Sequence, residues 1–287
     1  MTRPLRWIRN ILGSLVALFL VAVATIWMLG GRKLAAEFDI PEDAALAVLG
    51  GDSVIAAGQR LAILRGCIGC HGDDLGGQMF VDEFLLGRIA APNLSTLIPE
   101  YSDAELVRAL RHGIARDGRS LLIMPSSMLY HLADDDLGAI IAWLRTVPPV
   151  SDEWGQRKVG IMGRMGLAMG QFHVEASMYD HRAPRVPKDT TDARTWGEYL
   201  ARTMCTECHG LQLQGEVDFT PNLALVAGYT EEQFQHLLRT GEPLGGQTLT
   251  LMAEVIEGRL VHLTESEVHA LYSYLRTLAT TAAATRD

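Results

Sequence analysis

The longest uncharged apolar run of the chain lies near its N-terminus. The 19 residues Ile11–Leu29 contain no charged side chain. Because a helix rises about 1.5 Å per residue, this run would span most of the roughly 30 Å hydrocarbon layer of a bilayer. A cleaved signal peptide is the alternative, but its apolar core is usually about 7–15 residues long and ends in small residues. This run ends in Trp27, Met28 and Leu29. The pattern therefore predicts a cytoplasmic tail and transmembrane anchor over residues 1–33.

Beyond this run, apolar residues recur at helical spacing near the end of each half of the chain. One stripe consists of Leu137, Ile140, Ile141 and Leu144, and the other of Val268, Leu271, Tyr272 and Leu275. Apolar positions three and four residues apart share one face of a helix. We expect both stripes to be core.

Helix starts are marked by Ser or Thr three positions before Glu or Gln. These capping boxes are Ser102 with Glu105, Thr230 with Gln233 and Thr264 with Glu267. Each predicts the first turn of a helix. In the first half, Ala133 occupies the position that matches Thr264, so we expect Asp134 or its acidic neighbours to serve as the cap.

The two halves contain matching segments in the same order. The pairs are Gly58-Gln-Arg-Leu with Gly197-Glu-Tyr-Leu, Pro92-Asn-Leu with Pro221-Asn-Leu, Tyr101…Gly113 with Tyr229…Gly241, and Leu132…Thr146 with Leu263…Thr277. The step from Tyr to Gly is 12 positions in both halves. An internal repeat of this kind predicts two copies of one helical unit. We therefore predict an all-α chain with one unit over residues 34–150 and the other over residues 191–287.

Residues 151–190 are predicted to connect the two units. Met162, Met165 and Met169 are spaced for one face of a helix. Such a face would either pack between domains or contact a membrane neighbour.

Charge is distributed unevenly along the chain. The first 33 residues hold five of the 25 basic residues and none of the 34 acidic ones, so the remainder carries a net charge of −14. A body this acidic suits neither nucleic acid nor direct contact with an anionic membrane surface. A redox protein partner with a basic patch would complement it.

All four cysteines lie in two Cys-x-x-Cys-His motifs, Cys67–His71 and Cys205–His209. This is the attachment sequence of haem c, because two thiols at this spacing reach the two vinyl groups of one porphyrin and the histidine binds its iron. A zinc ribbon would place its pairs about 15–20 residues apart, and a thioredoxin-like site would need a βαβ setting. We therefore predict two covalently bound haem c groups, held by Cys67, Cys70, Cys205 and Cys208, with His71 and His209 as iron ligands.

Pro92 and Pro221 belong to the matching Pro-Asn-Leu segments. An iron-binding imidazole is usually oriented by a hydrogen bond from its other ring nitrogen, often to a backbone carbonyl. We expect a carbonyl of each Pro-Asn-Leu segment to accept that bond, with an ordinary loop turn as the alternative.

A methionine is the expected sixth ligand, since His/Met iron has a raised potential and no open position. Met252 is the only methionine after Cys208 and lies 11 residues beyond Gly241; the matching residue of the first half is Met124. The repeat therefore favours Met124 and Met252, on the loop before the last helix of each unit. Met128 and the histidines His131 and His262 remain alternatives. The other histidines near these loops are expected to be surface residues: His112, His236 and His269.

These segments resemble the class I cytochrome c fold, and within it the cytochrome subunits of bacterial membrane-bound dehydrogenases for alcohols and sugars. The segments that carry the resemblance are Cys67–His71, Ala91-Pro-Asn-Leu-Ser, Ser102…Gly113, Asp117-Gly-Arg, Met124-Pro125 and Leu132…Pro149. The likeness covers roughly residues 40–150 well and 190–280 less tightly. It implies one haem c per domain, His/Met ligation and electron transfer towards a respiratory acceptor. Those subunits often carry three haems, whereas this chain has two attachment motifs.

The combined prediction is a single-pass membrane protein with two haem domains on the periplasmic side. It would pass single electrons from a dehydrogenase or a quinol-oxidising partner to a terminal acceptor such as an oxidase, with no catalytic residues of its own. The alternative is a dihaem enzyme, a peroxidase or a small-substrate oxidase, in which one iron keeps an open position.

Overall fold

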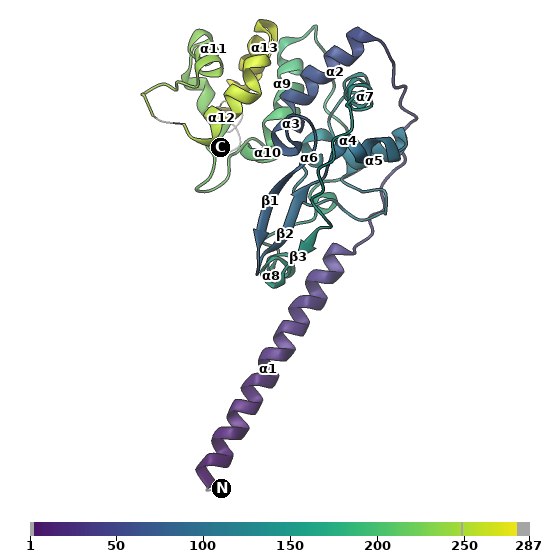
Figure 1. Ribbon diagram of the computed structural model, residues 1–287. Coiled ribbons are helices and arrows are strands. Elements are labelled where there is room, and N and C mark those ends of the chain that lie inside the picture. The colour runs from purple at the N-terminus through teal and green to yellow at the C-terminus, as the bar shows by residue number, and fades with distance from the viewer. Residues whose placement is uncertain (1–2, 248, 280–287) are drawn as a thin grey trace.

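The computed structural model describes residues 3–247 and 249–279, and Figure 1 shows their arrangement. The first segment is α1 (Arg3–Leu34), a single straight helix that projects away from the rest of the chain (Figure 1). Its part Arg6–Leu34 is long and apolar enough to cross a membrane.

The two halves contain mainly helices. The first half has α2 (Asp52–Leu64), α3 (Cys67–His71), β1 (Gln78–Glu83), β2 (Gly87–Ala91), α4 (Leu94–Leu97), η1 (Ile98–Glu100), α5 (Asp103–His112), α6 (Ser126–Leu129) and α7 (Asp134–Leu144). Between the halves lie β3 (Lys158–Val159), α8 (Ile161–Met169) and η2 (Glu175–Ser177). The second half has α9 (Ala193–Met204), α10 (Thr206–His209), η3 (Leu223–Gly228), α11 (Glu231–Thr240), α12 (Leu251–Gly258), η4 (Leu260–His262) and α13 (Glu265–Leu275).

Each half is built around one pair of closely packed helices, α2 with α7 and α9 with α13. A glycine allows the close approach in both pairs. A Cβ at Gly58 would lie 2.5 Å from the carbonyl carbon of Ala139, and a Cβ at Gly197 would lie 2.6 Å from that of Ala270. Both glycines begin the matching segments of the repeat, so the repeat preserves a helix contact that depends on a missing side chain.

The two predicted apolar stripes are buried in two separate cores. All eight side chains are at most 9% exposed. The stripe on α7 belongs to the core of the first half, and the stripe on α13 to the core of the second. The periodicity therefore located both cores correctly.

All three predicted capping boxes are present, at the starts of α5, α11 and α13. The expectation for α7 is wrong, because no side chain caps its N-terminus at Ala133. Instead the Ala133 N–H donates to the hydroxyl of Tyr199, 3.2 Å away on α9 of the other half. Asp134, Asp135 and Asp136 still occupy the first turn, where negative charge complements the helix dipole.

A small antiparallel sheet, with strand order β1-β2-β3, adds to the helical architecture. Its hairpin contains a register shift between Met79 and Val81, and β3 contributes only two residues from the connecting segment. Neither β1 nor β2 alternates regularly between buried and exposed residues, so the strand signal in the sequence is weak.

The prediction for His112 is also wrong, since this side chain is only 2% exposed. Its Nε2 lies 3.0 Å from a carboxylate oxygen of Asp43, and its Nδ1 lies 3.0 Å from Nδ1 of His181. Asp43 lies in the segment before α2, and His181 lies in the segment that connects the two halves. The histidines His236 and His269 are exposed, as expected.

Candidate haem-binding sites

The first Cys-x-x-Cys-His motif forms the short helix α3, immediately after α2. Gly66 separates the two helices in a left-handed conformation, with φ +80°. At the end of α3 the His71 side chain is 7% exposed, and its Nδ1 lies 2.9 Å from the carbonyl oxygen of Pro92. The backbone secures this pairing, because the Leu94 N–H donates to the carbonyl of Leu75 at 2.8 Å.

The second motif repeats this geometry. His209 is also 7% exposed, and its Nδ1 lies 2.8 Å from the carbonyl oxygen of Pro221. The Leu223 N–H donates to the carbonyl of Leu213 at 2.9 Å, as Leu94 does to Leu75 in the first half. In both motifs the Nδ1 contact leaves Nε2 as the nitrogen available to a metal.

Burial keeps the motif side chains uncharged. Desolvation lowers the pKa of His71 and of His209, so each imidazole is neutral at neutral pH. Desolvation also raises the pKa of the Cys67 and Cys205 thiols to about 12. A thioether carries no charge and a metal binds the neutral imidazole, so these residues fit a covalently attached haem c. All four cysteines are free of disulfides.

The two candidate methionines pack against the same cores as the motifs. Met124 contacts the core that Cys67 also contacts, and Met252 and Cys205 contact the other. Met124 lies on a loop, directly after Ile123, whose φ of +74° is strained for a branched side chain. Met252 instead lies in the first turn of α12, which differs from the loop position expected from the sequence.

The alternative ligands have other surroundings. Met128 is 1% exposed within the core of the first half. His131 accepts a hydrogen bond at Nδ1 from the Val186 N–H at 3.2 Å, and burial lowers its pKa to about 4. His262 is exposed, and its carbonyl accepts a hydrogen bond from Arg60.

Arg259 brings the two motifs together, a role that no local sequence signal indicates. Its guanidinium forms an ion pair of 2.9 Å with Glu207, inside the second motif. The same guanidinium borders the first motif, where a Cβ on Gly66 would lie 2.6 Å from Nη2 and a Cβ on Gly69 3.3 Å from it. Burial lowers the pKa of Arg259, but the charge and hydrogen bond of Glu207 oppose it, and the net shift is upward. One cation therefore lies next to both motifs.

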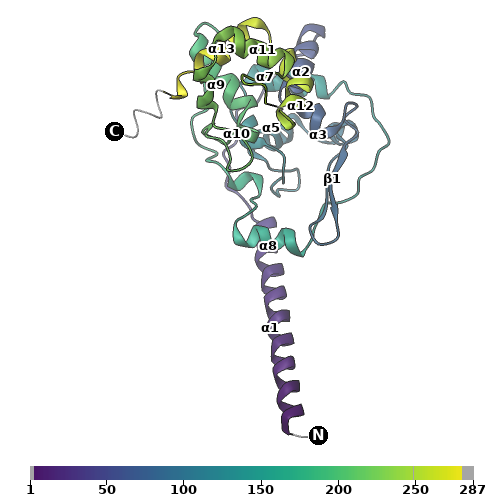
Figure 2. The same ribbon diagram turned by 90° about the vertical axis from the view of Figure 1, so that its left-hand side faces the viewer.

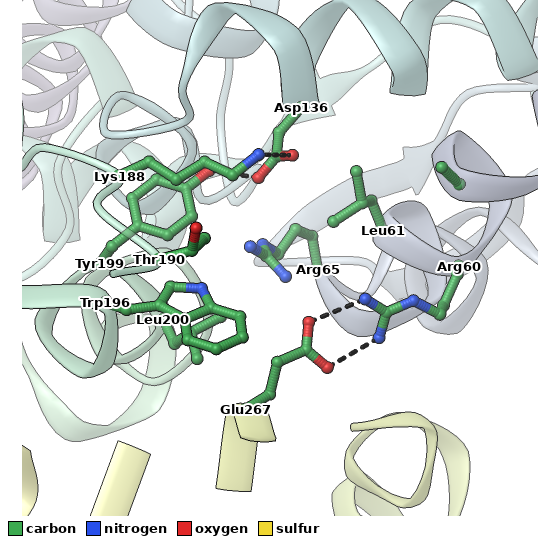
Figure 3. A pocket seen from close by; sticks show the side chains of 11 residues that line it. Arg60, Leu61, Arg65, Asp136, Lys188, Thr190, Trp196, Tyr199, Leu200 and Glu267 are labelled. Carbon is green, nitrogen blue, oxygen red and sulfur yellow. Dashed lines mark hydrogen bonds and ion pairs between the residues drawn. The ribbon is translucent and has the colours of Figure 1, made fainter. Parts of the chain in front are cut away.

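A cavity of about 240 Å³, lined by both charged and apolar side chains, lies where the helix pairs of the two halves meet (Figure 3). Arg60 on α2 reaches Glu267 on α13 with two hydrogen bonds of 2.9 and 2.7 Å. Across the cavity, Asp136 accepts a hydrogen bond of 2.5 Å from the Tyr199 hydroxyl and one of 2.7 Å from Lys188. The Arg60–Glu267 and Asp136–Tyr199 contacts therefore join α2 and α7 to the second half, and Lys188 joins α7 to the connecting segment.

Comparison with known proteins agrees with the motifs. A sequence model of the family described as cytochrome c matches residues 55–148 and again residues 196–279. The chain is 25% identical to the fructose dehydrogenase cytochrome subunit of Gluconobacter japonicus, over 90% of this chain and 58% of that protein. It is 26% identical to the gluconate 2-dehydrogenase cytochrome c subunit of Pantoea cypripedii, over 79% of this chain and 60% of that protein.

A third relative is the cytochrome c subunit of alcohol dehydrogenase (quinone) from Gluconobacter oxydans, 25% identical over 86% of this chain and 60% of the relative. The chain thus spans about 60% of the length of the relatives it matches. The two family matches cover most of both halves and include both Cys-x-x-Cys-His motifs. The chain belongs to the cytochrome c family.

Proposed function

We propose that this chain is a membrane-anchored dihaem cytochrome c that relays single electrons between redox proteins. The observation that carries the proposal is the duplicated motif geometry. Both attachment motifs have a buried histidine whose Nδ1 lies within 2.9 Å of a proline carbonyl, and one arginine touches both.

In each half, different residues would attach the haem, bind its iron and orient the iron-binding histidine. Cys67 and Cys70 in the first half, and Cys205 and Cys208 in the second, provide the thioether bonds. His71 and His209 bind iron through Nε2, while the carbonyls of Pro92 and Pro221 orient the rings. Haem c supplies a one-electron couple when bound, and Met124 and Met252 are the proposed sixth ligands. Thioether sulfur is a soft ligand that raises the reduction potential and closes the iron to other reactants.

Two domains in direct contact suit a relay. Arg259 borders both motifs, and the contacts around the cavity of Figure 3 hold the helix pairs together. Electrons could therefore move between the halves without a change in domain arrangement. We assign residues 34–150 and 191–287 to the two domains and residues 151–190 to the connector.

The helix α1 is the proposed single-pass anchor, with residues 1–33 as cytoplasmic tail and span. Its side chains are exposed along the apolar run, as lipid contact requires. Covalent haem attachment takes place outside the cytoplasm, so the two domains would lie on the periplasmic side of the cell membrane.

The relatives suggest the partner. Their names describe cytochrome subunits of dehydrogenases for fructose, gluconate and alcohols. A dehydrogenase is therefore the proposed electron donor, with a terminal acceptor of a respiratory chain as the proposed destination. The net charge of −14 after residue 33 favours a partner with a basic docking patch.

Ligand substitution tests the assignment of the irons. In protein produced with the cytochrome maturation machinery, wild-type chain should contain two covalently bound, low-spin haems with a sulfur-to-iron absorption band. Met252→Ala and Met124→Ala should each leave both haems attached, open one reduced iron to carbon monoxide and remove half of that band. Met128→Leu, at a core position of similar volume, is the matched control and should change neither property.

Two results would contradict the proposal. A purified protein with the mass of the bare polypeptide would end the haem assignment altogether. A wild-type protein in which one iron is high-spin and binds carbon monoxide would favour the enzyme alternative over a relay.

A further inference from the structure

The β1–β2 turn, α8 and Phe172 just after it expose a cluster of large apolar side chains, here called the apolar belt. Its members are Phe84 (96% exposed), Leu85 (47%), Leu86 (37%), Met162 (43%), Met169 (66%) and Phe172 (53%). Single exposed apolar residues are common on soluble surfaces, but a contiguous group marks an interaction site.

The backbone joins the two parts of the belt into one unit. The Gly160 N–H donates to the carbonyl of Leu86 at 2.8 Å, and the Met162 N–H donates to the carbonyl of Leu85 at 3.0 Å. The contact is close, since a Cβ at Gly163 would lie 2.8 Å from the Leu86 carbonyl oxygen. The hairpin turn is therefore bonded to the start of α8.

The same unit is docked on the end of the candidate membrane span. The guanidinium carbon of Arg164, on α8, lies 3.9 Å from the centre of the Trp27 ring. Gly30 is buried beneath α8, where a Cβ would lie 2.6 Å from the Cβ of Arg164. Figures 1 and 2 both show α8 and the hairpin turn beside the C-terminal end of α1.

The contact of α8 with the end of α1 indicates how deep the apolar belt would lie in a bilayer. The uncharged run ends at Leu29, between the two residues that contact α8. Tryptophan at such a boundary favours the headgroup level. The apolar belt therefore lies level with the edge of the hydrocarbon layer, where an apolar face immersed by about 5–10 Å is stabilised.

The charge around the belt differs from that of the rest of the chain. Cationic residues near it are Arg32, Lys33, Arg88, Lys158 and Arg164, and the acidic residues of the hairpin are Asp82 and Glu83. Arg88 pairs with Asp82 at 3.7 Å. The end of α1, the hairpin, β3 and α8 are therefore cationic when taken together, in contrast to the net charge of −14 of residues 34–287, and they suit lipid phosphates.

We propose that the apolar belt rests in the interfacial layer of the bilayer that α1 crosses. This inference rests on the anchor role of α1 and adds a second attachment, which fixes the height and tilt of both haem domains. Lipid is the occupant because the belt is continuous with the lipid-exposed span and shares its boundary. A protein partner in its place is an outcome of the test below.

Lipid photolabelling of the full-length haem-containing protein tests the proposal. The protein is placed alone in vesicles of phosphatidylcholine and phosphatidylglycerol that include a phospholipid with a diazirine in the upper acyl chain. After illumination, peptide mass spectrometry should find adducts on α1, on Phe84–Leu86 and on the segment from Met162 to Phe172. Val217 and Phe219 in the second half, 91% and 62% exposed, are matched apolar controls and should carry none.

The outcomes distinguish a failure of the belt proposal from a failure of the anchor assignment. Adducts on α1 with a bare hairpin and a bare α8 would overturn the proposal and leave the anchor intact, as expected if a protein partner covers the belt. Absence of adducts from α1 itself would overturn the anchor. Phe84→Asp should reduce hairpin adducts about tenfold, because an ionised carboxylate resists immersion, whereas Val217→Asp should change nothing. Both side chains are so exposed that neither change disturbs the core.

Discussion

The contact between α9 and α13 provides a quantitative test of the fold, through the substitution Gly197→Ala. The new Cβ would lie 2.6 Å from the carbonyl carbon of Ala270 and 2.8 Å from the Cβ of Tyr274. Carbon atoms in contact prefer about 3.5–4.0 Å, and the carbonyl oxygen of Ala270 lies closer still, so the two helices would have to separate by at least about 1 Å. The obstructing atoms belong to the backbone and to a Cβ, which have no rotamer by which to move away.

The expected cost follows from two opposing effects. Overpacking of a well-packed contact costs about 1–3 kcal/mol, and the upper part of that range applies to a backbone obstacle. The better helix propensity of alanine offsets about 1 kcal/mol. The net loss is about 2 kcal/mol, which for a protein of this size corresponds to a fall in Tm of about 4–8 °C.

Thermal unfolding of the haem-containing protein, followed by circular dichroism at helical wavelengths, measures the shift. Gly258→Ala is the matched control, since it also lies in a helix of the second half and has no atom within 4 Å of the new Cβ. Its Tm should stay within about 1–2 °C of wild type or rise slightly. Equal melting temperatures for the two variants would refute the argument that Gly197 is required for close helix packing.

Two further substitutions test the electrostatics of the site. Burial lowers the pKa of His131 to about 4 from its ordinary 6.5, so the unfolded chain binds this proton more readily than the folded one. Stability should therefore decline as the pH falls from about 6.5 towards 4, and His131→Gln should flatten that part of a Tm-against-pH curve; a curve of unchanged slope would contradict the assignment. Arg259→Gln removes the cation between the two motifs, so oxidised iron should be favoured and both midpoint potentials should fall in a redox titration. The exposed Arg276→Gln is its control, and a shift of only one potential would show that Arg259 does not serve both sites.

The helices, their caps and the attachment motifs were predictable from the sequence because the interactions that form them join residues only a few positions apart. The stripes on α7 and α13 follow from the 3.6-residue period, and the three capping boxes join a side chain to backbone three residues away. The spacing within Cys67–His71 reflects the size of a porphyrin. The duplication adds independent support, because matched positions in two halves are improbable by chance.

Features that depend on distant partners were missed. The N–H of Ala133, before α7, is bonded by Tyr199, 66 residues further along the chain, and His112 is buried against His181, 69 residues away. The strands β1 and β2 gain their order from pairing with each other, not from an alternating sequence. In each case the decisive partner has no fixed sequence distance and so leaves no local pattern.

The sequence by itself determined what each half contains: an attachment motif, an apolar helix pair, a methionine at a matched position and, ahead of them, one long apolar helix. Only the tertiary structure decided how these parts meet. It places Arg259 against both motifs, joins the halves through Arg60 and Glu267, and lays the hairpin turn and α8 beside the end of α1. The physical reason is that helix formation and cofactor spacing are set within a few residues, whereas packing depends on which surfaces fit when the whole chain is folded.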